Sequence, residues 1–190
     1  MADPNLPQGL LVALLQKHIW VPEQGLAYAL QSSNPQTKAS LLTEIIDYLP
    51  QNLREEALQK ALAAARAIQY EQDRAKALIA LVDKLPEVLP EALAAARAIP
   101  PGIARADALR ALADKLPPEL LPEALVATRA IQDEWCRAKA LIALADKLPP
   151  ELLPEALAAA RAMTDIEFEG EWYRADALGA VALKLPEVLP

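Results

Sequence analysis

The sequence repeats one helical pattern several times, and this repetition restricts the fold more than any other feature. A Leu-Pro pair recurs with its proline at 50, 86, 117, 149 and 186, so that the steps are 36, 31, 32 and 37 residues. Self-similarity at a period between about 20 and 50 residues indicates stacked supersecondary units. Each such unit buries its apolar face only against its neighbours. Two rows of arginines keep the same period, at Arg66, Arg97, Arg129 and Arg161 and at Arg74, Arg105, Arg137 and Arg174.

Each repeat divides into two predicted helices. In the first helix of one copy, residues 74–85, the side chains of Ala75, Leu78 and Val82 share one face at the 3.6-residue period. The Leu-Pro pair ends this helix, because a residue that precedes proline avoids the helical region. An interior proline would cost a helix about 3 kcal/mol. The second helices are therefore predicted to start near 89, 121 and 153, which places an inner proline in the first turn of each: Pro90, Pro122 and Pro154.

These patterns predict an all-α fold, namely a right-handed α-solenoid of stacked antiparallel helical hairpins with repeats of about 31–32 residues. Helices at 8–20 and 22–32 are expected to form an N-terminal helical cap within residues 1–35. Residues 36–190 are expected to form the solenoid, whose last repeat is incomplete. Helix 51–67 lacks the inner proline and is predicted to be the longest of the second helices. The other expected solenoid helices are 36–49, 73–85, 88–99, 103–116, 120–131, 134–148, 152–163 and 171–185.

The last repeat departs from the pattern. Arg161 and Arg174 stand 13 positions apart, whereas the equivalent arginines of the other copies stand 8 apart. The five extra residues fall within 164–173, which reads TDIEFEGEWY. Length beyond what packing requires is often where function lies, so this segment is either a contact loop or a plug between repeats. The incomplete repeat also predicts an open apolar edge, which favours end-to-end association.

Residues 137–162, RAKALIALADKLPPELLPEALAAARA, resemble α-solenoid repeats of the HEAT and tetratricopeptide kind. They look closer still to the Leu-Pro-punctuated helical repeats of cyanobacterial and other bacterial STAND proteins. The resemblance covers about residues 36–190 and implies a sensor or scaffold region of the kind that accompanies NACHT-type NTPase or WD-repeat modules. It implies no catalytic motif. The tetratricopeptide signature itself is not met, because the period here is shorter.

Composition restricts the expected partners and location. The formal net charge of −7 disfavours nucleic acid, because neutralising phosphates requires a basic face. No apolar run approaches the ~20 residues of a membrane span, and the apolar start lacks the basic residues of a signal peptide. A single cysteine forms no internal disulfide, which fits a cytoplasmic location. The five glycines make no phosphate-binding loop, so neither a nucleotide nor another cofactor is expected.

Three kinds of side chain could carry chemistry. His18, the single histidine, follows the first helix without a nucleophile or carboxylate nearby, and is interpreted as structural. Cys136 stands at a helix start, where the dipole could lower the pKa of its thiol, but a small buried role is favoured; it has no partner at metal-ligand spacing. Asp83, Asp114 and Asp146 recur with the repeat, so they are interpreted as a solvated or interlocking face rather than a catalytic pair. Neither a catalytic site nor a metal site is predicted.

Candidate binding residues are arginines and aromatics. Arg97, Arg129 and Arg161 either donate to acidic groups of a bound peptide or pair with neighbouring carboxylates, and the second interpretation is favoured. Aromatic side chains with charges nearby are typical binding anchors, although they could equally plug the turns between repeats. The aromatics in these turns are Tyr70, Trp135, Phe168, Trp172 and Tyr173.

One charge pattern bears on stacking between repeats. The residue two positions after each opening arginine alternates in sign, as Lys76, Asp107, Lys139 and Asp176. Stacked helices lie about 8–10 Å apart, so lateral ion pairs are predicted between these positions, each worth about 1 kcal/mol at most. The remaining face of the second helices is small, and forms either a smooth concave wall or a surface pressed on neighbours: Ala94, Ala98, Val126, Ala130, Ala158 and Ala162.

Three functions follow from these features. The favoured one is a non-enzymatic scaffold that binds a protein or peptide in a groove lined by the second helices, with 164–173 as a candidate contact. The alternative is a structural module that self-associates as a homo-oligomer through its C-terminal edge. An enzyme would require a pocket that holds His18 or Cys136 beside ionisable partners.

Overall fold

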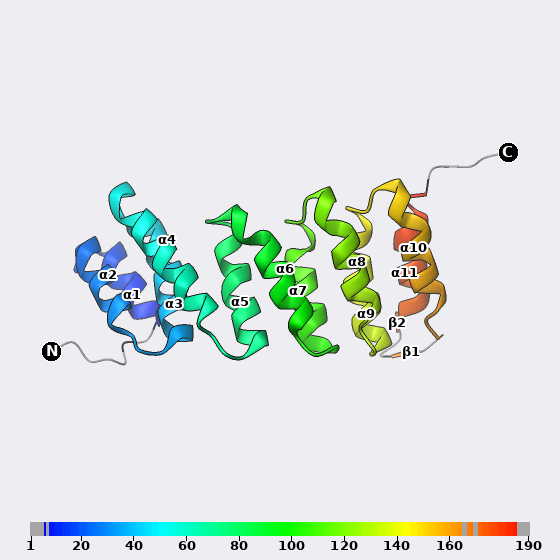
Figure 1. The fold of residues 1–190 in the computed structure, drawn as a ribbon, viewed down its shortest axis with the longest axis horizontal. Coiled ribbons are helices and arrows are strands. Elements are labelled where there is room, and N and C mark those ends of the chain that lie inside the picture. The colour runs from blue at the N-terminus through cyan, green and yellow to red at the C-terminus, as the bar shows by residue number, and fades with distance from the viewer. Residues whose placement is uncertain (1–5, 7, 165–166, 169–170, 186–190) are drawn as a thin grey trace. The chain divides into compact units, whose positions relative to one another are not determined.

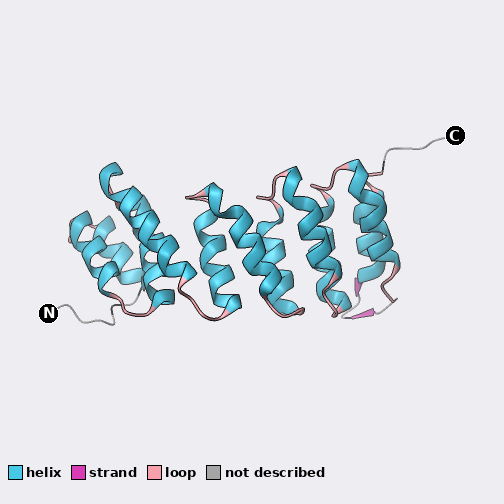
Figure 2. Ribbon diagram, viewed as in Figure 1, coloured by secondary structure: helices cyan, strands magenta, loops and turns pink. Residues whose placement is uncertain are grey.

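The computed structural model describes residues 6, 8–164, 167–168 and 171–185, and the fold is all-α (Figures 1 and 2). The chain divides into two compact units, Met1–Ala92 and Leu93–Pro190, and the boundary falls inside a helix. The predicted division at residue 35 stays a prediction. The α-helices are α1 Gln8–Gln16, α2 Pro22–Gln31, α3 Pro35–Ile45, α4 Gln51–Arg66, α5 Glu71–Val82, α6 Leu89–Ala98, α7 Ile103–Ala113, α8 Leu121–Arg129, α9 Glu134–Ala145, α10 Leu153–Arg161 and α11 Tyr173–Ala182.

The first unit is built around α3. This helix packs against α1, α2, α4 and α5, and its Leu42 and Ile45 side chains are fully buried. The helix α4 has 16 residues, against 9 or 10 for α6, α8 and α10, which confirms the prediction that it is the longest second helix. At the end of α1, His18 adopts a positive φ of 53°. The turn it makes lets the amides of Ile19 and Trp20 donate to the carbonyl of Leu14.

In the second unit, each first helix packs against the next first helix. The helix α7 contacts α9, and α9 contacts α11; α8 and α10 both lie against α9, and α10 also lies against α11. Fully buried leucines line these contacts, among them Leu109, Leu125 and Leu141. Their apolar side chains drive the packing, because each buried leucine contributes about 1.5–3 kcal/mol relative to an exposed one.

The Leu-Pro pairs form a recurring joint between the two helices of a repeat. At three of the pairs, those with prolines 86, 117 and 149, a three-residue 3-10 turn leads into the second helix: Pro86–Val88, Pro118–Leu120 and Pro150–Leu152. The second helices then begin at Leu89, Leu121 and Leu153, which confirms that the inner prolines lie in the first turn. A further 3-10 helix, Ile46–Tyr48, precedes the first joint.

The first helices end about three residues earlier than predicted. The helices α5, α7 and α9 end at Val82, Ala113 and Ala145, and the Asp-Lys-Leu that follows closes in tighter turns. The hydrophobic pattern continues through this turn, because the leucine before each proline is still buried, and this is why periodicity alone overestimated the helices.

A partly buried arginine contact closes the turn between repeats. The Arg74, Arg105 and Arg137 guanidinium groups each donate to the carbonyl of the residue six positions earlier, at distances of 2.7–3.2 Å. These carbonyls belong to Ile68, Ile99 and Ile131, at the ends of the second helices. In the last repeat the spacing differs, because Met163, the equivalent of Ile131, stands eleven residues before Arg174 rather than six.

The insertion itself contains two short strands that the sequence did not predict. Strand β1, Glu167–Phe168, pairs antiparallel with β2, Glu171–Trp172, in the register Glu167 with Trp172 and Phe168 with Glu171. The helix α11 consequently starts at Tyr173 rather than at 171. Phe168 and Trp172 are predicted as binding anchors, but their side chains are not among those that the structure describes.

Candidate functional site

The site that contains two of the predicted aromatics, Trp135 and Tyr173, is an apolar cavity of about 380 Å³ in the second unit. It lies where α9 and α11 begin and where α10 has just ended, so Thr164 and Tyr173, the two ends of segment 164–173, border it. Ile103, at the start of α7, stands at its rim with 60% of its surface exposed. The lining residues are Ile103, Asp133, Glu134, Trp135, Met163, Thr164, Tyr173 and Arg174.

The aromatic side chains Trp135 and Tyr173 form one wall of the cavity. Their rings meet edge to face, with centroids 6.3 Å apart and an interplanar angle of 88°. The Lys139 ammonium lies 4.1 Å from the centroid of the Trp135 ring, within the range of a cation–π interaction. Tyr173 is buried and Trp135 is half-buried. The structure therefore brings together two of the five aromatics named as candidate anchors and fixes their relative orientation.

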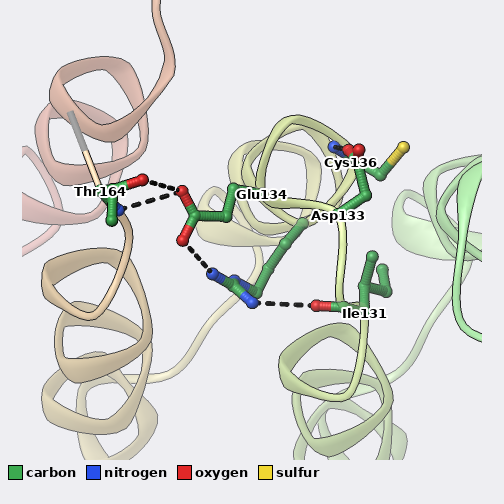
Figure 3. A network of polar contacts seen from close by, with 6 residues as sticks. Ile131, Asp133, Glu134, Cys136 and Thr164 are labelled. Atoms are coloured by element: carbon green, nitrogen blue, oxygen red, sulfur yellow. Dashed lines mark hydrogen bonds and ion pairs between the residues drawn. The ribbon is translucent and has the colours of Figure 1, made fainter. Parts of the chain in front are cut away.

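A polar network anchors the start of the insertion (Figure 3). The Glu134 carboxylate accepts hydrogen bonds from the backbone amide of Thr164 at 3.1 Å and from its hydroxyl. The same carboxylate accepts from the Arg137 guanidinium at 3.3 Å. The Thr164 hydroxyl is the main reason that the pKa of Glu134 lies below its usual value. Glu134 thereby ties the end of α10 to the beginning of α9.

Asp133 caps α9 and faces the cavity. Its side chain accepts from the backbone amide of Cys136 at 2.8 Å, and this bond is the main cause that lowers the pKa of Asp133. Cys136 is buried, and burial together with the neighbouring Asp133 raises the pKa of the thiol to about 12. The favoured interpretation of Cys136 as a small buried residue is thus supported, and the alternative, a thiol whose pKa is lowered by the helix dipole, is not, because desolvation disfavours the thiolate. Cys136 is a buried apolar filler.

The predicted arginine row pairs between successive second helices. Arg97 and Arg129 form ion pairs with Glu123 and Glu155, which lie in the first turn of the next second helix. In the first unit, Arg66 binds Glu91 in the same way, at 2.7 Å. These contacts support the favoured interpretation, pairing with neighbouring carboxylates, for Arg97 and Arg129; donation to a peptide stays a prediction.

Arg161 differs from the other members of the row. It is exposed, and within 8–164, 167–168 and 171–185 no carboxylate forms an ion pair with it. The equivalent glutamate of a following second helix is not among these residues. Arg161 is therefore a cation that faces solvent at the end of α10.

The predicted lateral pairing of alternating charges is wrong for Asp107 and Lys139. Asp107 pairs with Arg110 one turn along its own helix, at 3.1 Å, and Lys139 lies over Trp135. A different row connects the first helices, through the Asp-Lys turns that follow them. Its pairs are Lys84 with Asp47, Lys147 with Asp114 at 3.7 Å, and Lys184 with Asp146 at 2.8 Å. The recurring aspartates are thus partly an interlocking face, as the sequence suggested.

The other chemical candidates stay apart from the cavity. His18 is exposed at the end of α1, in the first unit, and does not line the site. Among the residues with described side chains, no cluster of three or more His, Cys, Asp or Glu is placed to hold a metal ion. No helix in the described part of the chain combines the length and hydropathy that crossing a membrane requires.

Sequence reasoning missed Ile103, Asp133, Glu134 and Met163 as lining residues, whereas Thr164 belongs to the predicted contact segment 164–173. The 13-residue spacing from Arg161 to Arg174 indicated that this turn is lengthened, but it did not indicate which other residues lie beside the turn. Comparisons of the chain with protein-family models, with curated proteins and with solved structures gave no match.

Proposed function

We propose that this chain is a non-enzymatic helical-repeat scaffold that binds a protein or peptide, and that the cavity beside Trp135 is its recognition site. The observation that carries the proposal is the coincidence of the cavity with the one turn where the repeat is lengthened. Interior turns are closed by an arginine bond to the isoleucine carbonyl, as between Arg137 and Ile131. At the lengthened turn, Met163 and Arg174, the equivalents of Ile131 and Arg137, both line the apolar cavity.

The cavity suits an apolar side chain of a partner. Its volume of about 380 Å³ lies at the lower end of the roughly 300–1,000 Å³ typical of ligand sites. Trp135, Tyr173 and Met163 supply large apolar surfaces, and aromatic anchors in such pockets commonly dominate binding energy. The two carboxylates in the wall, Asp133 and Glu134, already accept hydrogen bonds from the chain itself. Recognition therefore depends on shape and apolar contact more than on new ion pairs.

We further propose that the repeated helix pairs form a right-handed α-solenoid, in which the module serves as a sensor or scaffold region of a larger cytoplasmic protein. The support is the succession of first-helix contacts within each unit and the recurrence of the same ion pairs from repeat to repeat. A compact 190-residue chain would have a radius of gyration of about 16 Å. Small-angle scattering is expected to give a clearly larger value, and a value near 16 Å would contradict the solenoid.

Matched surface substitutions test the binding site. Ile103 and Val126 are both exposed, at 60% and 52%, but only Ile103 lines the cavity. A displayed peptide library selected on the full chain should yield apolar sequences whose binding is lost in Ile103→Glu and kept in Val126→Glu. Equal binding to both variants, or no enrichment at all, would remove this site from consideration.

A self-associating structural module is the alternative, and the exposure of Leu183 at 85% is the observation that favours it. Light scattering of the chain at high concentration separates the two proposals, because a monomer would eliminate self-association. Catalysis gains no support from Cys136, since its thiol is buried and its pKa is raised. We favour the binding function because the cavity is the more specific feature.

A further inference from the structure

In the last helix pair, α10 with α11, several apolar side chains are exposed or half-buried. The equivalent side chains of the preceding pair, α8 with α9, are buried. Leu141 on α9 is fully buried, whereas its equivalent Leu178 on α11 is half-buried. Ala138 is likewise buried, whereas its equivalent Ala175 is exposed. We call this surface the terminal face; it comprises Leu157, Ala175, Leu178, Ala182 and Leu185.

The surface of the pair α8–α9 that is equivalent to the terminal face is covered by the following pair, α10–α11. The helix α11 packs against α9, and α10 packs against α9 as well, so the Leu141 position is sealed by the following pair. Leu185 is 38% exposed, whereas Leu148, the leucine of the preceding joint, is 7% exposed. The same side chains therefore change from buried to open where no further pair is described. In the interior, the surface equivalent to the terminal face is covered by the second helix and the first helix of the following pair.

The charge of Arg161 restricts which helix could bind the terminal face. Each interior arginine of the row, Arg97 and Arg129, is met by a glutamate in the first turn of the next second helix. Arg161 stands at the same position beside the terminal face and is exposed. Glu187 follows it by 26 residues but lies outside the described residues. The sequence LPEVLP at 185–190 repeats that at 85–90, so Glu187 corresponds to Glu87 and not to the pairing Glu91.

The terminal face lacks the aspartate that forms the second row of ion pairs, in which an aspartate after one first helix binds a lysine after the next. Where Asp114 and Asp146 bind a lysine of the following pair, the last pair carries Leu183. Leu183 is 85% exposed, which adds apolar surface at the edge of the terminal face. The occupant consequently needs a carboxylate opposite Arg161 but no lysine opposite the end of α11.

We propose that the terminal face binds a helical hairpin whose second-type helix has an Ala/Leu side and a glutamate in its first turn, as α8 and α10 have. A second copy of this chain fits less well. In α4, the first of the second helices, Lys60 takes the place of the pairing glutamate, so a copy that offered α4 would bring a lysine to Arg161. The glutamates of α8 and α10 already bind arginines of their own chain.

A synthetic peptide with the sequence of residues 86–116 tests this proposal, because it contains Glu91 in the required place and no cysteine. Fluorescence anisotropy of the labelled peptide with the full chain should show saturable binding. The Ala175→Arg variant should weaken binding at least about tenfold, since the added side chain occupies an apolar seat. The control is Ala158→Arg, because Ala158 and its equivalent Ala94 are both exposed.

A charge exchange tests the role of Arg161. A peptide with Glu91→Lys should bind the parent chain about tenfold more weakly, and Arg161→Glu should restore its binding. Absence of saturable binding, equal binding by Ala175→Arg and Ala158→Arg, or failure of the charge exchange would each overturn the proposal. Dimerisation of the chain that Ala175→Arg abolishes would also overturn it, because a second copy would then be the occupant. Binding at the cavity is independent of these outcomes, since Ile103→Glu leaves the terminal face unchanged.

Discussion

The pair α8–α9 and the pair α10–α11 share most of their apolar positions, yet their surroundings differ. Leu141, Ala138 and Leu148 are buried in the first pair, and their counterparts in the second pair are exposed or half-buried. The helices themselves are of similar length, at 9 and 12 residues against 9 and 10. Burial in this chain is thus a property of the neighbouring pair, as expected for repeats that bury their apolar faces only against one another.

The turns between the two helices of each pair also differ. Between α8 and α9, the Arg137 guanidinium bonds the carbonyl of Ile131 and the turn is short. Between α10 and α11, five more residues intervene and an apolar cavity forms beside Trp135. The added residues are not required by packing, because the interior turns close without them. This difference is the reason to place the function at the lengthened turn.

The largest expected effect comes from truncating equivalent leucines in the two pairs. Leu141→Ala removes a fully buried side chain and should lower the free energy of unfolding by about 2–5 kcal/mol. Leu178→Ala removes a half-buried side chain whose site can rehydrate, and should cost about 1 kcal/mol. Urea unfolding of both variants measures the difference. Equal costs would show that the terminal face is covered in solution.

A smaller effect is expected at the start of α9. Asp133→Ala removes the acceptor for the Cys136 amide and should destabilise the chain by about 1 kcal/mol. Asp133→Asn keeps an acceptor of similar geometry and should stay within a few tenths of a kcal/mol of the parent. Thermal and urea unfolding provide the measurement. If the two variants are equally destabilised, charge rather than capping is the function of Asp133.

The arginine row offers a weaker comparison between the two pairs. Arg129 pairs with Glu155, but the pair is exposed, so Arg129→Ala should cost no more than about 1 kcal/mol and less at high salt. Arg161→Ala should leave the free energy of unfolding unchanged, because no described carboxylate binds this side chain. A double-mutant cycle on Arg129 and Glu155 isolates the pair energy. A cost for Arg161→Ala as large as for Arg129→Ala would reveal a partner for Arg161.

The smallest predicted effect is a pH dependence at the lengthened turn. The pKa of Glu134 is lowered in the folded chain, mainly by the Thr164 hydroxyl. Its contribution to stability is therefore complete above the unfolded pKa, about 4.3, and is lost as pH falls through the folded value. Thr164→Val should move the pKa of Glu134 toward its ordinary value in a carboxyl NMR titration. No movement would mean that the hydroxyl does not bond this carboxylate.

The helix pattern could largely be read from the sequence, whereas the site could not. The inner prolines fixed the starts of α6, α8 and α10, because proline tolerates only the first turn. The ends of α5, α7 and α9 were misjudged, since buried leucines continue the apolar pattern beyond the helix. The predicted lateral pairing of Asp107 and Lys139 is wrong, because Asp107 pairs with Arg110 and Lys139 lies over the Trp135 ring. Ile103 and Met163 could not be linked to the cavity, since no local pattern brings residues 60 positions apart together.

The account depends on successive helix pairs sealing one another, and hydrogen exchange of the full chain measures this most directly. Amides of α9 should exchange only through openings of high free energy, because α11 and α7 pack on this helix. Amides of α11 should exchange at least about tenfold faster, and addition of the 86–116 peptide should slow them toward the α9 rates. Equal protection of α9 and α11 without the peptide would contradict the account.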